Sequence, residues 1–230
     1  MSTKTTTKVA HYYVQKQRRA EFIEEWRANQ RTVVALEDVE MHETSRRMRR
    51  GVYVGADGGR PTRSMDATAH EIDPGAVSTV HRHSWDAMMF CVAGEAWTEI
   101  DGERIEWGPG DSLHLPAWSW HRHGNNGSTT ARYLTFSSEP MLETMGMAMI
   151  EDGGDADVAT LAPRPPFSPA IDGSDPYAER LRRLAADQEA RRGGRLHTSW
   201  DSLEILPKPR GTPTSLHLDR AIGYQASGIT

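Results

Sequence analysis

The sequence predicts an all-β core that carries helical arms at its N-terminal and C-terminal ends. Between residues 51 and 140, short segments rich in β-branched and aromatic residues alternate with turns of Gly, Pro and Asp. Asp101-Gly102 separates Ala96–Ile100 from Glu103–Trp107, which is the pattern of a β-hairpin. Many short strands at regular turn spacing are typical of an antiparallel sandwich or barrel.

The N-terminal arm is predicted to span residues 1–50. Its first residues, Met1 to Lys8, are polar, and no apolar run in the chain is long enough for a signal peptide or a membrane span. The segment from Gln15 to Glu40 is rich in strong helix formers. Its apolar residues recur at a spacing compatible with one or two amphipathic helices.

The C-terminal arm is predicted to span residues 141–230. Glycine and proline are frequent up to Asp175, which indicates a loop or linker. A helix is expected over Pro176 to Arg192, with proline at its start and Gly193-Gly194 after its end. The remaining tail is too short to form a core of its own, so we expect it to pack on the barrel or on a partner subunit.

Composition narrows the classes of partner and compartment. The 230 residues carry a formal net charge of -5. A net acidic chain does not favour nucleic acid or an anionic membrane surface as a partner. The one cysteine, Cys91, allows no intrachain disulfide and is expected to be a small buried side chain. With no apolar leader, these features predict a cytoplasmic protein.

Two histidines of the predicted core are spaced as metal ligands. His81 and His83 are two residues apart, so on a strand their side chains share one face while Arg82 points away. Neutral imidazoles on the inner face of a barrel are good ligands for Fe, Mn, Ni, Cu and Zn. The pair is not specific by itself, and a second segment is needed to support a metal site.

That second segment follows the predicted hairpin, and together the two resemble the paired motifs of the cupin superfamily. The matching positions are Gly75, His81, His83 and Gly94 in the first motif, and Gly110, Pro116, His121 and Asn125 in the second. The resemblance covers roughly residues 65 to 137. It implies a cupin jelly-roll β-barrel in which His81, His83 and His121 bind one metal ion.

The chain departs from the cupin pattern at two positions. Ala87 occupies the place of the glutamate ligand, and Trp118 occupies the place of the glycine in the second motif. The resemblance therefore implies a site of three neutral histidines with open positions. Such a site suits Fe(II) that must bind both a substrate and O2, and it leaves Mn, Ni, Cu and Zn as alternatives.

Within the cupins, the chain is similar to gentisate-type and salicylate-type ring-cleaving dioxygenases. They share the His-Arg-His sequence followed by alanine, and the segment from Trp120 to Asn125. The resemblance implies that His123 hydrogen-bonds the substrate. It also implies an arginine two residues after the alanine, where this chain has Met89. An apolar side chain at that inward position favours a more neutral substrate than an aromatic acid.

Other residues are candidates for the substrate pocket. Met89 is two residues after Ala87, so on a strand its side chain should also point inward. Trp85 and Trp118 border the two motifs, and Arg46 and Arg50 lie upstream of the barrel. The tryptophans can stack on an aromatic ring, although a purely structural role fits them equally well. A surface or structural role fits His123 as well as a substrate contact does. Two further polar residues, His114 and Asp86, match no ligand position, and we expect a strand residue and a loop residue there.

The function that these features predict is a mononuclear Fe(II) dioxygenase that oxidises a phenolic or enolisable small molecule, with ring or C–C cleavage. His123 would exchange a proton with the substrate hydroxyl. One alternative is a metal-dependent lyase, isomerase or hydrolase that does not consume O2, and another is a cupin that only binds a ligand. The long arms predict a homodimer or a higher homo-oligomer in which they cover a partner subunit.

Overall fold

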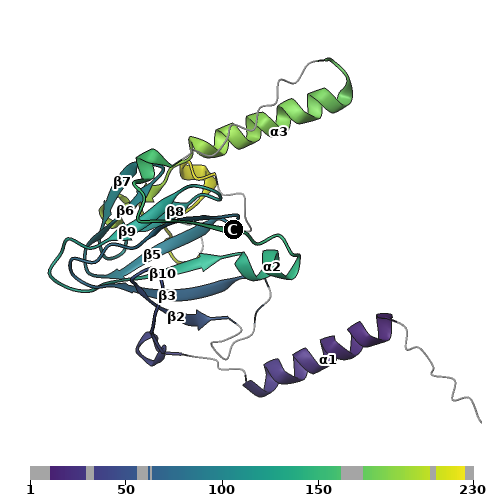
Figure 1. The fold of residues 1–230 in the computed structure, drawn as a ribbon, viewed down its shortest axis with the longest axis horizontal. Helices are drawn as coiled ribbons and strands as arrows, with labels where there is room; N and C mark the ends of the chain where they lie inside the picture. Colours follow the sequence, from purple (N-terminus) through teal and green to yellow (C-terminus); the bar gives the residue numbers. More distant parts are fainter. Residues whose placement is uncertain are drawn as a thin grey trace, which may run out of the picture.

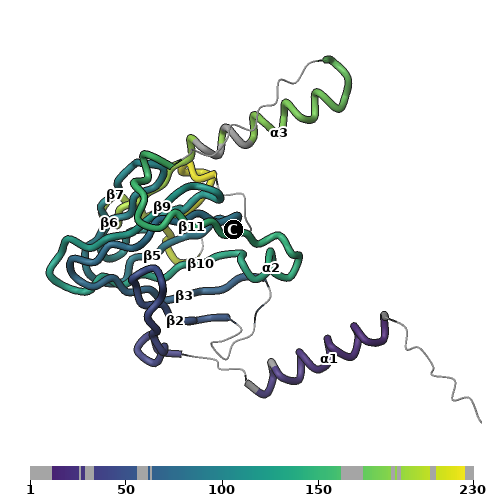
Figure 2. Tube along the Cα trace, viewed as in Figure 1, coloured from purple at the N-terminus to yellow at the C-terminus, as the bar shows by residue number. Residues whose placement is uncertain are grey.

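The computed structural model describes residues 11–29, 34–55, 62, 64–161, 173–207 and 211–225. Two β-sheets form the body of the molecule, and two long helices stand clear of them (Figure 1). Helix α1 spans His11–Asn29 and helix α3 spans Pro176–Arg192. The tube in Figure 2 follows the same course. The mostly β architecture with helical arms agrees with the fold class that the sequence predicts.

The larger sheet has seven strands and the smaller has five, and every pairing is antiparallel. The larger sheet runs in the order β1 (His42–Glu43), β2 (Arg49–Val54), β3 (Asp66–Ile72), β10 (Ala131–Ser137), β5 (Ala87–Ala93), β8 (Ser112–Leu115) and β12 (His197–Thr198). The smaller sheet runs in the order β11 (Ile150–Gly154), β4 (Val80–His83), β9 (His121–Gly124), β6 (Ala96–Ile100) and β7 (Glu103–Trp107). This order, with neighbours distant in sequence, is that of jelly-roll sheets.

The apolar core is formed by inward-facing residues of strands from both sheets. On β5, Ala87, Met89 and Cys91 are buried, whereas Met88 and Phe90 are more exposed. This alternation is the period of a strand with one face on the core. The predicted hairpin is confirmed, since β6 and β7 pair on either side of the Asp101-Gly102 turn.

The predicted helices are confirmed in part. The bounds of α3 agree with the prediction, and Asp175 accepts hydrogen bonds from the backbone N–H groups of Tyr177 and Ala178 at its start. Helix α1 ends at Asn29, well before Glu40. Residues 30–33 lie outside the described part. Between residues 34 and 40, the helical structure is a short 3-10 turn at Leu36–Asp38.

Two segments that were expected to lie outside the β core belong to its sheets. Strand β1 and the first residues of β2 come from the predicted N-terminal arm. In the predicted linker, helix α2 (Glu139–Thr144) leads to β11, which pairs with β4 along the edge of the smaller sheet. The sequence of β11, Ile-Glu-Asp-Gly-Gly, has little strand propensity, so its pairing depends on the neighbouring strand. The prolines of this segment lie outside the described residues.

The C-terminal tail contacts the larger sheet through β12, which pairs with β8. Thr198 on β12 is hydrogen-bonded to Tyr224, 2.6 Å between the hydroxyl oxygens. Three further 3-10 turns complete the described elements, at Val158–Thr160, Trp200–Ser202 and Arg220–Ile222. Among the described helices, none combines the length and apolar character that a membrane span requires.

Candidate metal centre and its pocket

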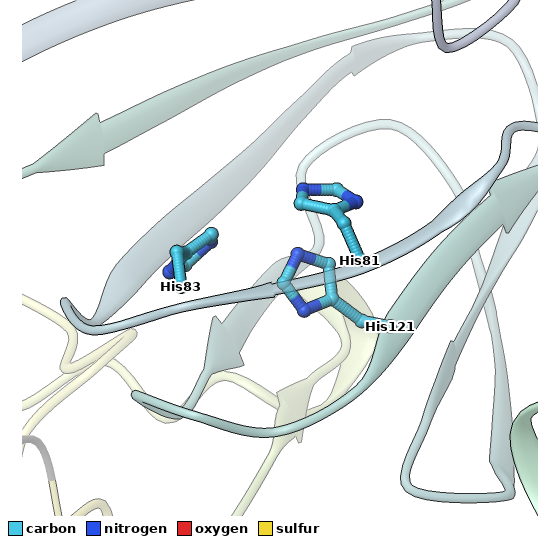
Figure 3. A group of neighbouring side chains, drawn as sticks. All are labelled: His81, His83 and His121. Carbon is cyan, nitrogen blue, oxygen red and sulfur yellow. The ribbon is translucent and has the colours of Figure 1, made fainter. Parts of the chain in front are cut away.

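Three histidines of the smaller sheet meet on its inner face (Figure 3). His81 and His83 come from β4, and strand pairing sets His81 opposite His121 on β9. Their ligand atoms all lie within 4.8 Å of one another. Across the described residues, this is the one group of three or more His, Cys, Asp or Glu side chains close enough to hold a metal ion.

Backbone carbonyls orient two of the three imidazoles. The Nδ1–H of His83 donates to the Trp85 carbonyl at 2.7 Å, and that of His121 donates to the Ser119 carbonyl at 2.9 Å. A carbonyl can only accept, so the proton must be on Nδ1 and the lone pair on Nε2. The Trp85 ring also stacks on His83, with centroids 4.5 Å apart and planes 5° apart. Both imidazoles therefore present a nitrogen that can bind a metal.

Burial keeps the three imidazoles neutral. It lowers the pKa of His83 to about 3 and that of His121 to about 4. The pKa of His81 also falls well below the usual value, first through burial and then through the neighbouring His121. The Nδ1 atom of His81 is buried without a hydrogen-bond partner. Three neutral nitrogen donors, two of them oriented by backbone carbonyls, suit a divalent first-row transition metal, since protons would compete with the ion.

A cavity of about 250 Å³ opens between the two sheets beside these histidines. That volume lies near the lower end of ordinary ligand pockets and fits one small molecule. Its walls include His123 and Trp85, with Ala87 at the position of the absent glutamate. The further lining residues are Thr44, Ser45, Arg46, Met48, Arg50, Asp66, Thr68, His70, Leu115, Tyr133, Thr135, Ser137, Glu139 and Ile150.

The wall facing the histidines is a ladder of polar pairs from β3 and β10. The strand register sets His70 opposite Tyr133, Thr68 opposite Thr135 and Asp66 opposite Ser137. The His70 and Tyr133 rings stack with centroids 4.8 Å apart, the two threonine hydroxyls lie 2.6 Å apart, and Ser137 donates to Asp66 at 2.7 Å. We call these three pairs the polar ladder.

His123 lines the pocket and is held by a side-chain network. Its Nδ1 is 2.9 Å from Thr98 Oγ1, which also accepts the indole N–H of Trp107 at 2.9 Å. The Thr98 hydroxyl proton then has its best acceptor in His123 Nδ1, because the other neighbour, the Met89 sulfur, is 4.0 Å away. This arrangement leaves the ring proton of His123 on Nε2. Burial lowers the pKa of His123 well below the usual value, so the ring is neutral.

Two arginines, one in the turn before β2 and one on β2, line the pocket. Arg46 lies in the turn before β2, where its Nη1 is buried without a hydrogen bond and 3.6 Å from Asp152. Burial lowers the pKa of Arg46, and Asp152 partly offsets this. Arg50 on β2 approaches Asp66 at 3.9 Å. Both arginines line the cavity, and their predicted contact with a substrate stays a prediction.

Two of the expected pocket residues lie elsewhere. Met89 has the inward phase, but it is fully buried in the apolar core and does not line the cavity. Trp118 packs beside Arg82 on the other face of β4, 4.9 Å from the guanidinium carbon to the ring centroid. Its φ of 67° lies in the left-handed region, which explains why a glycine is common at this motif position. The Trp118 N–H also donates to the carbonyl of His83.

Asp86 lies in the loop that leads from β4 to β5, and His114 on β8 holds it there. The carboxylate of Asp86 accepts from His114 Nε2 at 2.8 Å and from the backbone N–H of Ala117 at 3.1 Å. Asp86 follows Trp85, whose carbonyl and ring both contact His83. The pair therefore fixes the loop that supports one of the three histidines.

Sequence reasoning did not single out Glu139 or the residues of the polar ladder. Members of each ladder strand are two residues apart, and that spacing is the only sequence signal they carry. Glu139 follows β10 and has no motif around it. It reaches the pocket because the β3–β10 register carries the start of α2 to this edge.

Comparisons with known proteins agree with this geometry. Residues 69–137 match the family described as the cupin domain. The chain is 30% identical over 84 residues to a 5-aminosalicylate 1,2-dioxygenase of Comamonas sp., a match covering 36% of this chain and 22% of the relative. It is 35% identical over 97 residues to a gentisate dioxygenase of Aquipseudomonas alcaligenes, covering 42% and 28% respectively.

A solved salicylate 1,2-dioxygenase from Pseudaminobacter salicylatoxidans is also similar, with 26% identity and a TM-score of 0.41 over 50% of this chain and 36% of that one. The chain spans about a quarter of the length of the curated relatives named above. The matched segment contains all three of the converging histidines and most of the polar ladder. Residues 69–137 therefore form a cupin domain, and gentisate and aminosalicylate dioxygenases are among the proteins to which this part of the chain is similar.

Proposed function

We propose that the protein is a mononuclear Fe(II) dioxygenase that cleaves a small phenolic compound. The observation that carries this proposal is the set of three neutral imidazoles, two buried and one partly buried, on one wall of a cavity sized for one small molecule. The names of the relatives, dioxygenases of aminosalicylate and gentisate, support it. Both atoms of O2 would enter the cleaved product, so the reaction would need no separate reductant.

Fe(II) bound by His81, His83 and His121 would supply open coordination positions and the one-electron chemistry that O2 requires. The protein's own part is to hold these donors neutral and aligned before the metal arrives. Carbonyls of Trp85 and Ser119 do this for His83 and His121. Mn, Ni, Cu and Zn could use the same donors, so the choice of iron rests on the named relatives.

His123 is proposed to bind the substrate through its Nε2–H. Thr98 fixes the ring on its other side, so Nε2 is the atom left to face the cavity. A neutral N–H group in a buried pocket stabilises a phenolate or hydroxyl oxygen without bringing a full charge.

Arg46 is proposed to bind an anionic group of the substrate. Its buried Nη1 forms an ion pair with Asp152 at 3.6 Å but makes no hydrogen bond, and an unsatisfied guanidinium N–H is costly to bury. A carboxylate would satisfy it and would complement the charge. The sequence analysis expected a more neutral substrate because Met89 stands where the related dioxygenases have an arginine. This proposal revises that expectation, because Arg46 brings a positive charge to the pocket from a different position. A phenolic acid is the class of substrate that both Arg46 and His123 fit.

The decisive experiment measures metal and oxygen together. Protein purified anaerobically and loaded with Fe(II) should consume one O2 per molecule of phenolic acid converted, with loss of the aromatic absorbance. His121→Ala should abolish both the stoichiometric iron and the oxygen uptake. The matched control is His42→Ala, since His42 lies on the exposed strand β1 and should leave both unchanged.

Two outcomes would overturn the proposal. Turnover of the substrate under strict anaerobiosis would instead support a lyase, isomerase or hydrolase in which the metal acts only as a Lewis acid. Full activity in protein stripped of metal by a chelator would remove any role for the three histidines in binding iron.

A further inference from the structure

The C-terminal tail covers His114 on the outer face of the larger sheet. On β8, Leu113 and Leu115 belong to the apolar core, so the side chain of His114 between them points outward. An outward side chain is exposed unless another segment covers it, yet His114 is only 1% exposed. The tail provides the cover. Strand β12 pairs with β8, the backbone N–H of His114 donates to the Leu196 carbonyl at 2.9 Å, and the Tyr224 ring lies edge-on to the imidazole, with centroids 6.3 Å apart.

Tyr224 is held in place by other residues of the tail. Its hydroxyl oxygen is 2.6 Å from that of Thr198 on β12, and its backbone N–H donates to the Asp219 carbonyl at 3.2 Å. The Arg195 guanidinium carbon lies 6.0 Å from the ring centroid, and the tyrosine is buried. These contacts fix the ring against the sheet.

His114 connects the tail to Asp86. Its Nε2 is 2.8 Å from Asp86 Oδ1, and the two side chains are 2% and 5% exposed. The other ring nitrogen of His114, Nδ1, is buried without a hydrogen-bond partner in the described part of the chain. An apolar side chain at this position would avoid the free-energy cost of that unsatisfied atom. The bond to Asp86 therefore explains a histidine here, whereas packing under the tail does not.

Asp86 in turn fixes the residue that orients His83. Its carboxylate also accepts the backbone N–H of Ala117 at 3.1 Å, so it joins the loop after β4 to the loop after β8. The residue before it, Trp85, accepts the Nδ1–H of His83 through its carbonyl and stacks its ring on the same imidazole. Because the peptide between Trp85 and Asp86 is planar and rigid, a shift of Asp86 moves the acceptor that sets the direction of His83.

We propose that the C-terminal tail positions His83 and so sets the metal affinity of the site. It acts through Tyr224, His114 and Asp86, which we call the tail relay. These are positioning residues, because none of them lines the cavity. The proposal rests on the three-histidine metal site of the proposed function and not on the reaction carried out there. It gives a role to a segment outside residues 69–137, the matched cupin domain.

Metal binding tests the relay without turnover. Full-length protein is titrated with Co(II) against a competing chelator, and the visible absorption of the bound ion reports its coordination geometry. His114→Leu removes the donor to Asp86 and fills the space with an apolar side chain. It should shift the Co(II) absorption and lower the affinity by about 10-fold, the lower end of the loss caused by removing a group that supports a metal ligand. His114→Gln, whose amide can still donate, should keep the affinity within about 3-fold.

Substitutions at Tyr224 test the part played by the tail. Tyr224→Leu removes the ring beside His114 and should lower the affinity for Co(II) by about 3- to 10-fold. Tyr224→Phe keeps the ring and loses only the bond to Thr198, so the affinity should stay within about 2-fold. The variant that combines His114→Leu with Tyr224→Leu should bind Co(II) as His114→Leu does, because the tail acts through that histidine.

Two controls separate positioning from a general loss of stability. Glu71→Ala breaks ion pairs with Arg49 and Arg132 on the outer face of the same sheet, whereas the end of β10 beside Asp86 is at Ser137. Trp200→Ala removes an exposed aromatic side chain of the tail that lies over Gly110. Both controls should keep the affinity for Co(II) within about 2-fold and leave its absorption unchanged.

Unchanged Co(II) affinity and absorption in His114→Leu and Tyr224→Leu would contradict the proposal. Equal losses in the two controls would contradict it as well, and so would additive losses in the combined variant, since the tail would then act by another route. If His114→Leu does not fold, the comparison of Tyr224→Leu with Tyr224→Phe decides. Iron-loaded protein that consumes no O2 would overturn the proposed function and leave the tail relay standing, whereas unmodified protein that binds no Co(II) would overturn the relay.

Discussion

The two walls of the pocket are built in different ways. On the β4–β9 wall, backbone carbonyls orient the imidazoles of His83 and His121. On the β3–β10 wall, side chains hold each other in cross-strand pairs. A backbone acceptor stays in place when a neighbouring residue changes, whereas a side-chain partner is lost with one substitution. We call the β4–β9 wall, which carries the three histidines, the metal wall. The geometry of its imidazoles should tolerate substitutions of neighbouring side chains. Substrate preference should instead vary with substitutions in the polar ladder.

The largest expected effect is on the metal wall itself. His121→Ala removes one of the three nitrogen donors. Loss of a residue that only supports a metal ligand lowers metal affinity by roughly 10- to 100-fold. Loss of a ligand itself should lower the affinity for Fe(II) or Zn(II) by more than this. Thr135→Val on the facing wall should leave metal affinity within about 2-fold, because it contacts no histidine of the triad. Titration with a competing chelator measures both. Equal losses in the two variants would show that the walls are not independent.

The sequence predicts the metal wall much better than the polar ladder. His81, His83 and His121 were identified because their spacing matches two motifs, and strand alternation alone sets Arg82 on the opposite face. The hairpin at Asp101-Gly102 and helix α3 carry equally local signals in their turn and capping residues. These elements are predictable because the residues that determine them are neighbours in the chain.

The polar ladder and β11 could not be predicted in this way. Asp66 and Ser137 are 71 residues apart, and only the β3–β10 register brings them together. Strand β11 contains Asp152, Gly153 and Gly154, whose weak strand propensity is overridden by pairing with β4. Met89 was expected to line the pocket because side chains alternate along a strand and its side chain points inward. This alternation gives the direction of a side chain but does not say whether it reaches the cavity. Met89 lies in the apolar core and does not line the cavity.

The second prediction concerns His123, which lies on the metal wall but depends on a side chain. Thr98→Val keeps the shape of the side chain and removes the hydroxyl shared by His123 Nδ1 and Trp107 Nε1. Two buried polar groups lose their partner, so the free energy of unfolding should fall by about 2–4 kcal/mol. Urea denaturation measures this loss. Metal affinity should change little, and a loss as large as that of His121→Ala would contradict the separation of roles.

The third prediction is a pH dependence of the polar ladder. The pKa of Glu139 is raised from 4.5 to about 7, so the folded state keeps its proton while the unfolded chain ionises. This group therefore lowers stability as pH rises from 4.5 towards 7, and the penalty is complete above pH 7. A fully sheltered group would cost about 3 kcal/mol, and partial exposure reduces the expected penalty to about 1 kcal/mol.

Glu139→Gln should accordingly be more stable than the unmodified protein by about 1 kcal/mol at pH 8 and equal to it at pH 4. Thermal unfolding at several pH values measures the difference. A constant difference across this range would mean that ionisation of Glu139 is not its source. Glu103→Gln on β7 provides the control, because its side chain is exposed and it is not among the charges that act on Glu139.

The smallest expected effect lies behind the metal wall, at Trp118. Its left-handed φ of 67° strains any residue that has a Cβ, and the contact with Arg82 offsets part of that strain. Trp118→Ala loses the contact and keeps the strain, whereas Trp118→Gly loses both. The glycine variant should therefore be more stable than the alanine variant by about 1 kcal/mol. The opposite order in urea denaturation would show that the turn relaxes without the tryptophan.

Strand β11 has a consequence for how short a working version of this domain can be. It pairs with β4, so Ile150 lies opposite His83 and Asp152 lies opposite His81. A chain cut at residue 140, where the cupin motifs have ended, would turn β4 into an edge strand with unpaired N–H and C=O groups. Exposed edges of this kind associate with other strands, and His81 and His83, which are proposed to bind the metal, would lie on that edge. Such a fragment should precipitate through the same strand that carries two of the proposed metal ligands.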